Sequence, residues 1–149
     1  MNKCYIAGRI GEDEDKDRRI ALFGYVENLL REAGYVPVNP TRTVVSRWRW
    51  LYRIVGYKLT LLYDLWLLLR CDNIYKIPGW EVSRGANIES CTAFHFHKYP
   101  IYPSCRENID RQVRARAAEI GVKIEERGDR NYSGYSNYSG YRRFKNGRI

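Results

Sequence analysis

The sequence is poor in the residues from which metal and disulfide sites are built. Its 149 residues include two histidines, His95 and His97, and four cysteines, and no two of the cysteines form a C-x-x-C pair. Side chains two positions apart on a helix point in directions that differ by about 200°, so the two histidines are not expected to share a metal ion. We interpret the cysteines as free thiols of a reducing compartment. The sequence therefore predicts a cytoplasmic protein with no metal site and no disulfide framework.

Two common phosphate-binding motifs are also missing. The sequence contains no G-x-x-x-x-G-K-[ST] and no G-x-G-x-x-G, and the Gly-rich residues 8–11 are a weak signal on their own. We therefore expect no dinucleotide and no other cofactor. Any nucleotide site in this chain has to be built from other residues.

The sequence has no long uncharged apolar run. The most apolar stretch, residues 48–69, is interrupted by Arg49, Arg53, Lys58 and Asp64. A membrane-spanning helix needs roughly 20 nearly uncharged residues. We therefore expect a buried, partly amphipathic helix in this stretch and no membrane partner.

Positive charge is concentrated in two parts of the chain, whose formal net charge is +9. Residues 41–63 contain five Arg and Lys residues and no acid, and residues 128–149 contain five and a single Asp. The second part also repeats N-Y-S-G-Y, which is typical of a flexible, low-complexity tail. Such charge either keeps a surface solvated or attracts phosphate-bearing ligands and nucleic acid. Each segment taken alone favours solvation, and nucleic-acid binding is the weaker hypothesis.

Apolar segments of strand and helix character alternate along residues 1–127. Strands are expected at residues 3–7, 35–38, 73–77, 100–102 and 122–125, and helices at residues 17–33, 46–70, 85–97 and 107–120. This alternation predicts a single α/β domain with a parallel sheet. Right-handed crossovers make it a doubly wound, five-stranded sheet of flavodoxin or Rossmann type with helices on both faces. Residues 128–149 follow as a separate tail.

In such a domain, ligands bind beyond the carboxyl ends of the strands. Residues 78–89 follow the third strand, and there Ser83 precedes a helix that begins near Gly85 and carries Glu89 about one turn inside. The Ser83 hydroxyl and the first backbone N–H groups of that helix would form an anion site. The same residues also suit an ordinary helix start, with Ser83 as the cap and Glu89 as a partner of the helix dipole. The pattern alone favours the ordinary helix start.

Asp64 is a second carboxylate in an unusual place. It lies in the most apolar helix of the chain, with Leu61, Leu65 and Leu68 as its helical neighbours. An unpaired carboxylate on an apolar face is costly, so Asp64 has to reach water, a partner or a ligand. A shift of the helix phase that leaves Asp64 at a solvated edge is the alternative.

Several short motifs occur in a characteristic order. They are Y-I-A-G at residues 5–8, V-N-P at 38–40, Asp64 with Cys71-Asp72, I-P-G-W-E at 77–81 and S-x-G-A-x-x-E at 83–89. In this order they resemble the nucleoside 2-deoxyribosyltransferase superfamily, and most closely a small family of uncharacterised phage and bacterial proteins within it. The resemblance covers about residues 3–103. It implies an α/β fold and cleavage of the N-glycosidic bond of a nucleoside or nucleotide.

The resemblance also implies roles for individual residues. Glu89 would be the nucleophile at the anomeric carbon, Asp64 would assist at the base or sugar, and Tyr5 would position Glu89. Superfamily members that act on free nucleosides carry an acid at the position of Ser83, whereas serine is found in those that act on 5′-monophosphates. Ser83 therefore implies a nucleoside 5′-monophosphate as the ligand. Further contacts to it are expected from Gly8, Arg9, Arg42, Trp80, Arg84 and Gly85.

These observations predict a nucleotide N-glycosidase that releases a free base and (deoxy)ribose 5-phosphate. A nucleoside deoxyribosyltransferase and a non-catalytic module that binds or senses a nucleotide are the alternatives. Superfamily members are commonly homo-oligomers, and the apolar helix at residues 48–69 fits a homodimer or a higher homo-oligomer.

Overall fold

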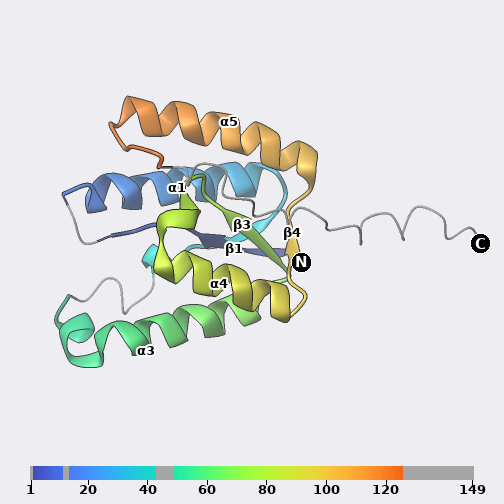
Figure 1. Ribbon diagram of the computed structural model, residues 1–149. Helices are drawn as coiled ribbons and strands as arrows, with labels where there is room; N and C mark the ends of the chain where they lie inside the picture. The colour runs from blue at the N-terminus through green and yellow to red at the C-terminus, as the bar shows by residue number, and fades with distance from the viewer. Residues whose placement is uncertain (1, 12–13, 43–48, 126–149) are drawn as a thin grey trace, which may run out of the picture.

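A four-stranded parallel sheet forms the centre of the protein. The structure is a computed structural model, and it describes residues 2–11, 14–42 and 49–125, except for the side chains of 49–55 and 57. The strands lie in the order β2-β1-β3-β4 (Figure 1). They span Lys3–Ala7 (β1), Val36–Val38 (β2), Asn73–Lys76 (β3) and Tyr99–Pro100 (β4). Tyr5 is in register with Val38 on one side and with Ile74 on the other.

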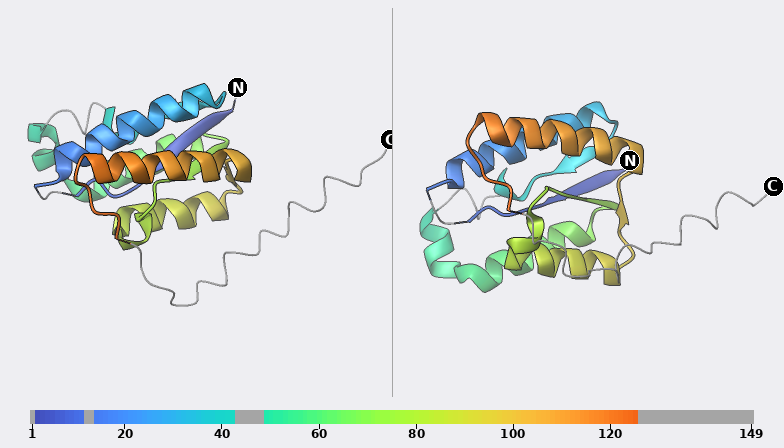
Figure 2. Two further views of the ribbon diagram at one scale, coloured as in Figure 1. Left: turned by 90° about the horizontal axis from the view of Figure 1, so that it is seen from above. Right: turned by 45° about the horizontal axis from the view of Figure 1, so that its top comes forward.

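Four α-helices among the described residues cover the two faces of the sheet. Helices α1 (Lys16–Glu32) and α5 (Pro103–Glu119) pack together on one face, and α3 (Arg49–Leu69) and α4 (Arg84–His95) pack together on the other (Figures 1 and 2). The short 3-10 helices η1 (Pro40–Arg42) and η2 (Trp80–Val82) follow β2 and β3. The chain is therefore an α/β protein of Rossmann-like type with helices on both faces of a parallel sheet.

Strand β1 shows why the sheet has to be covered on both sides. Cys4 and Ile6 belong to the core beneath α1 and α5, whereas Tyr5 and Ala7 belong to the core beneath α3 and α4. All four side chains are fully buried, as expected for a central strand of a parallel sheet. The side chain of Tyr5 is thereby directed toward α3 and α4.

The predicted fifth strand at residues 122–125 is wrong. The Val122 amide donates to the Ala117 carbonyl oxygen over 2.8 Å and so closes the end of α5. Residues 122–125 then lie against the turn at Gly79, where an added Cβ would be 3.2 Å from the Glu125 carbonyl oxygen. The segment thus packs on the turn that follows β3 and does not extend the sheet. The edge strand β4 has only two residues and offers little backbone for a fifth strand to pair with.

The strand at residues 3–7 is present as predicted, and the other predicted elements are present with shifted ends. Helix α3 lies within the predicted helix at 46–70 but is broken at Gly56, which has φ 75° and ψ 164°. Helix α5 begins about one turn earlier than predicted, with Pro103 in its first turn, where its missing N–H costs nothing. The predicted tail at 128–149 lies outside the described residues. Among the described helices, none is long and apolar enough to cross a membrane.

The outer surface of α3 exposes a stripe of large apolar side chains. We call this the α3 stripe, and it consists of Leu59, Leu62, Tyr63, Trp66 and Leu69. The rings of Tyr63 and Trp66 stack with their centroids 5.6 Å apart.

The strand order also indicates where a ligand would bind. From β1 the chain goes to β2 on one side, and it then crosses back to β3 on the other side of β1. In open parallel sheets, ligands bind beyond the carboxyl ends of the strands at such a reversal. The segments that begin at Gly8 and at Ile77 follow the carboxyl ends of the two central strands, and α4 begins shortly after the second of them.

Candidate functional site

Tyr5 and Glu89 form a buried hydrogen-bonded pair. The Tyr5 hydroxyl donates to Glu89 Oε1 over 2.7 Å, although the two residues are 84 positions apart in the sequence. Tyr5 comes from β1, and Glu89 comes from the second turn of α4, on the side that faces the sheet. The pair brings together two of the three residues for which the sequence predicts a catalytic role.

The third of these residues, Asp64 on α3, lies close enough to act on both members of the pair. Burial raises the pKa of Tyr5 well above its ordinary value, and the charges of Glu89 and Asp64 raise that pKa further. The phenol therefore remains a hydrogen-bond donor at neutral pH. The side chain of Asp64 is half-buried, between the apolar face and the solvated edge of the helix.

Both carboxyl groups take up protons far more readily than free carboxyl groups do. Burial raises the pKa of Glu89 from 4.5 to about 8, with the Tyr5 hydrogen bond opposing the rise and the charge of Asp64 adding to it. Burial raises the pKa of Asp64 from 3.8 to about 7. Carboxyl groups that titrate near neutrality can exchange protons with a ligand at neutral pH, which acid–base chemistry needs.

Ser83 caps α4, as the sequence predicts. Its backbone is extended, with φ −91° and ψ 120°, and its Oγ accepts a hydrogen bond from the Ala86 amide over 3.3 Å. The Asn87 side-chain amide donates to the carbonyl oxygens of Ser83 and Glu81 over 2.7 and 2.8 Å and so holds the turn in place. Because the Ser83 oxygen acts as an acceptor in the cap, its own proton can be donated outward to an anion. Arg84 and Gly85 form the start of the helix beside it.

The remaining predicted substrate residues have protein partners in the structure. Gly8 is tightly packed, because an added Cβ would be 3.0 Å from Phe23 Cζ and 3.2 Å from Ile77 Cβ. Arg9 forms an ion pair of 3.2 Å with Glu125, and Arg42 forms one of 2.9 Å with Glu27. The Trp80 ring lies under the amino group of Lys76, which is 4.1 Å from the ring centroid.

The family described as "Domain of unknown function (DUF4406)" matches residues 2–100. The chain belongs to this family. Neither a curated protein nor a solved structure matches the chain. The DUF4406 match runs from β1 to β4 and so contains Tyr5, Asp64, Ser83 and Glu89, whereas α5 and Glu125 lie beyond it. Because the DUF4406 description names no function, the resemblance to the nucleoside 2-deoxyribosyltransferase superfamily stays a prediction.

Sequence reasoning missed one charged group within the DUF4406 match. Lys76, in β3, donates to Ser90 Oγ over 3.3 Å, next to Glu89 on the same helix. Burial, together with the charge of Arg106, lowers the pKa of Lys76 to about 8. The only signal in the sequence is a lysine in the apolar run N-I-Y-K-I at 73–77. Its contacts indicate that Lys76 holds Trp80 against α4.

A second missed feature fixes the turn after β2. Glu27 is buried, and its Oε2 accepts from the side-chain amide of Asn39 over 3.1 Å as well as from Arg42. Asn39 Oδ1 in turn accepts from the amide and the hydroxyl of Thr41, over 3.0 and 2.7 Å. Arg42, which the sequence predicts to contact the substrate, is therefore paired with Glu27 in the structure.

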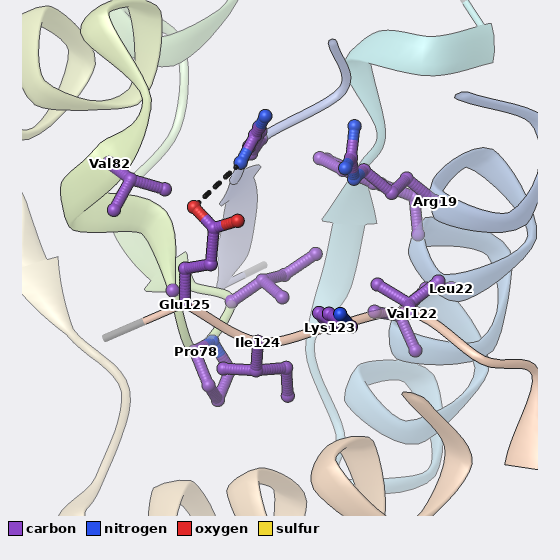
Figure 3. Close-up of a pocket in the computed structure, with 12 residues that line it drawn as sticks. Arg19, Leu22, Pro78, Val82, Val122, Lys123, Ile124 and Glu125 are labelled. Atoms are coloured by element: carbon purple, nitrogen blue, oxygen red, sulfur yellow. Dashed lines mark hydrogen bonds and ion pairs between the residues drawn. The ribbon is translucent and has the colours of Figure 1, made fainter. Parts of the chain in front are cut away.

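A small cavity lies at the carboxyl ends of β1 and β3, apart from the carboxylate pair (Figure 3). Its volume is about 30 Å³, and Tyr5, Asp64 and Glu89 are not among its lining residues. Leu22 and Phe23 of α1 form part of its wall, so it belongs to the α1 and α5 face of the sheet. Sites for drug-sized ligands usually measure hundreds of Å³, so this cavity cannot enclose a nucleotide.

Proposed function

We propose that the protein is a nucleotide N-glycosidase that cleaves the base–sugar bond of a (deoxy)nucleoside 5′-monophosphate. The observation that carries this proposal is the 2.7 Å hydrogen bond from Tyr5 to Glu89, made inside a buried site that Asp64 also reaches electrostatically. Cleavage of a glycosidic bond passes through a sugar cation, which a carboxylate at the anomeric carbon stabilises. Such chemistry requires a carboxylate that is fixed in position and a second group nearby that can donate a proton.

In the proposed reaction, Glu89 acts as the nucleophile. One Glu89 oxygen bonds to the anomeric carbon while the bond from that carbon to the base nitrogen breaks, and the electron pair leaves with the base. The base takes up a proton from Asp64 when that residue is protonated, or otherwise from water. Water then cleaves the sugar–Glu89 ester, which restores the carboxyl group and releases (deoxy)ribose 5-phosphate. The Tyr5 hydrogen bond to Oε1 fixes the carboxylate and leaves its other oxygen for attack.

The raised pKa values of the pair set its working pH. The nucleophile has to be ionised, and the pKa of Glu89 is about 8. The proposed acid has to be protonated, and the pKa of Asp64 is about 7. In the ligand-free protein, the productive form, with Glu89 ionised and Asp64 protonated, is therefore a minority of the singly protonated pair. Positive charge that develops on the sugar favours the ionised form of Glu89 as the reaction proceeds.

The start of α4 supports a phosphate on the substrate. Ser83 can donate its hydroxyl proton, and the first N–H groups of a helix attract anions. Ser83 and Glu89 lie on the same helix, so a single rigid element would hold the phosphate and the sugar of one ligand. We therefore place the 5′-phosphate at Ser83.

The test is to incubate the purified protein with all ribo- and deoxyribonucleoside 5′-monophosphates and to measure free base by chromatography. Wild type should release base from at least one of them, and Glu89→Gln should lose this activity by about three orders of magnitude or more. Glu119→Gln removes a carboxylate on the surface of α5 and should change nothing. If folded protein binds one of these nucleotides and releases no base from any of them, the protein is not an N-glycosidase for this substrate class.

The raised pKa of Glu89 also favours a second function. At pH 7 a group with a pKa of about 8 is mostly protonated in the ligand-free protein, and a neutral carboxyl group can donate a hydrogen bond to a base or sugar. The same site would then bind or sense a nucleotide without turnover. Isothermal titration calorimetry separates the two functions, because the binding module requires nucleotide affinity that Glu89→Gln preserves, together with no released base.

A further inference from the structure

The small cavity is built from four separate segments. Figure 3 shows the side chains of Arg19 and Leu22 from α1, Pro78 and Val82 from the turn and η2 after β3, and residues 122–125 gathered around it. The loop after β1 contributes Arg9. Because Val82 directly precedes Ser83, the cavity adjoins the turn that leads into α4.

The charged residues around the cavity are mostly cations. They are Arg9, Arg19 and Lys123, with Glu125 as the only acid among the residues that line it. Arg19 is 8% exposed, and its guanidinium is held by the Ile10 carbonyl oxygen at 3.3 Å and by Asp15 at 3.7 Å. Asp15 and Glu125 each offset one arginine, so Lys123 carries the net positive charge of the site. A positive charge beside a partly enclosed, apolar-walled site attracts anions to it.

An anionic group of the protein itself already lies at this site. Glu125 Oε2 is 3.2 Å from Arg9 Nη1, and the dashed line in Figure 3 marks this contact. The two side chains are 34% and 60% exposed, so the ion pair is in contact with water and is weak. Arg9 at the edge of the cavity thus already holds one oxyanion, and the weakness of the pair allows another oxyanion to replace Glu125 there.

We propose that the cavity between Arg9, Arg19 and Lys123 is a second anion site, which takes a phosphate group, and that Glu125 competes with that group for Arg9. The volume of about 30 Å³ is too small for a base or a sugar and suits a few oxygen atoms. Arginine presents two N–H groups in a fork that matches the oxygens of phosphate. The site lies apart from the Tyr5–Glu89 pair and does not depend on the proposed N-glycosidase reaction.

Two substitutions of opposite charge test the site. The affinity for inorganic phosphate is measured by isothermal titration calorimetry at constant ionic strength. Lys123→Gln removes a cation from the wall and should weaken binding about three- to fivefold, whereas Glu125→Gln removes the competitor and should tighten binding by a similar factor. Lys98→Gln and Glu119→Gln make the same charge changes away from the cavity and serve as controls. No binding by folded wild type, or a dissociation constant for either test variant that equals that of its control, overturns the proposal.

The source of the phosphate is distinguished with nucleotides. Nucleoside 5′-mono- and 5′-diphosphates of each base are titrated into Glu89→Gln, so that turnover does not interfere. If the second phosphate of a nucleotide occupies the cavity, the diphosphate binds more tightly than the monophosphate, and adding Lys123→Gln removes the difference. If free phosphate is the ligand, the two nucleotides bind alike, while the effects of the two substitutions on the affinity for inorganic phosphate remain. Failure of base release would leave these results unchanged, so the two proposals can fail separately.

Discussion

Replacing Glu89 by Gln should stabilise the folded protein most strongly at alkaline pH. In the folded chain the pKa of Glu89 is about 8, whereas its ordinary value is 4.5. The folded state therefore binds this proton more tightly than the unfolded state does. The stability that the proton confers is fully present below pH 4.5, and it is lost as the pH rises to about 8. Glutamine does not titrate, so the variant does not lose this stability as the pH rises.

The size of the effect follows from the two pKa values. Each tenfold difference in proton affinity corresponds to about 1.4 kcal/mol. The interval between 4.5 and about 8 therefore corresponds to roughly 5 kcal/mol of unfolding free energy. Between pH 5 and pH 8.5, where most of this interval is crossed, the variant should gain roughly 4 kcal/mol relative to wild type. The Tyr5 hydroxyl can still donate to the glutamine carbonyl oxygen, so the geometry of the site should be preserved.

Urea unfolding at a series of pH values, followed by tryptophan fluorescence, measures this difference. Glu119→Gln, on the surface of α5, controls for the loss of one negative charge. If the difference in unfolding free energy between Glu89→Gln and wild type is the same at pH 5 and pH 8.5 within about 0.5 kcal/mol, Glu89 is not a buried group with a raised pKa. The physical basis given for its chemistry would then be wrong.

Three further changes test other parts of the site. Tyr5→Phe removes the hydrogen bond that lowers the pKa of Glu89, so the rise of kcat/KM with pH should move to higher pH and base release at pH 7 should fall about tenfold. Ser83→Asp keeps a helix cap but repels a phosphate, so KM for nucleoside monophosphates should rise about tenfold or more while KM for free nucleosides does not. Leu62→Glu with Trp66→Glu introduces charge into the α3 stripe, so light scattering should show that a homo-oligomer dissociates.

Each of these three expectations has a result that would contradict it. An unchanged pH profile for Tyr5→Phe, with Tyr99→Phe on exposed β4 as the matched control, would show that the phenol does not tune Glu89. Equal effects of Ser83→Asp on nucleotides and nucleosides would remove the phosphate from the start of α4. A monomeric wild-type protein at micromolar concentration would leave the α3 stripe without a role in self-association.

Local pattern was sufficient for much of the fold. The apolar run at residues 3–7 and the cap at Ser83 are signals that neighbouring residues generate by themselves, and both elements are present in the structure. Residues 122–125 also alternate apolar and polar side chains, yet they form no strand. A strand needs a partner edge as well as a pattern, and this segment packs on the turn at Gly79. The break at Gly56 has no signal beyond the glycine itself.

The sequence motifs singled out side chains that the structure places near one another, but they did not specify all of the contacts. The ordered motifs singled out Tyr5, Asp64 and Glu89, and the structure brings these three together. The partner of a surface arginine depends on which acid the fold brings near it. Arg9 accordingly meets Glu125, 116 positions away along the chain. Neither the residues around Arg9 nor those around Glu125 contain a pattern that predicts this ion pair.

The position of the Tyr5 hydroxyl depends on the two-residue repeat of β1. In this strand, alternate side chains face the two helical layers, so inserting or deleting one residue before Tyr5 would turn its hydroxyl toward α1 and away from Glu89. The same slip would carry Cys4 and Ile6 into the opposite core. A change of length in β1 would therefore break the Tyr5–Glu89 hydrogen bond and would also disrupt both cores. Variants of this fold that keep the hydrogen bond should accordingly keep the five residues of β1 in register.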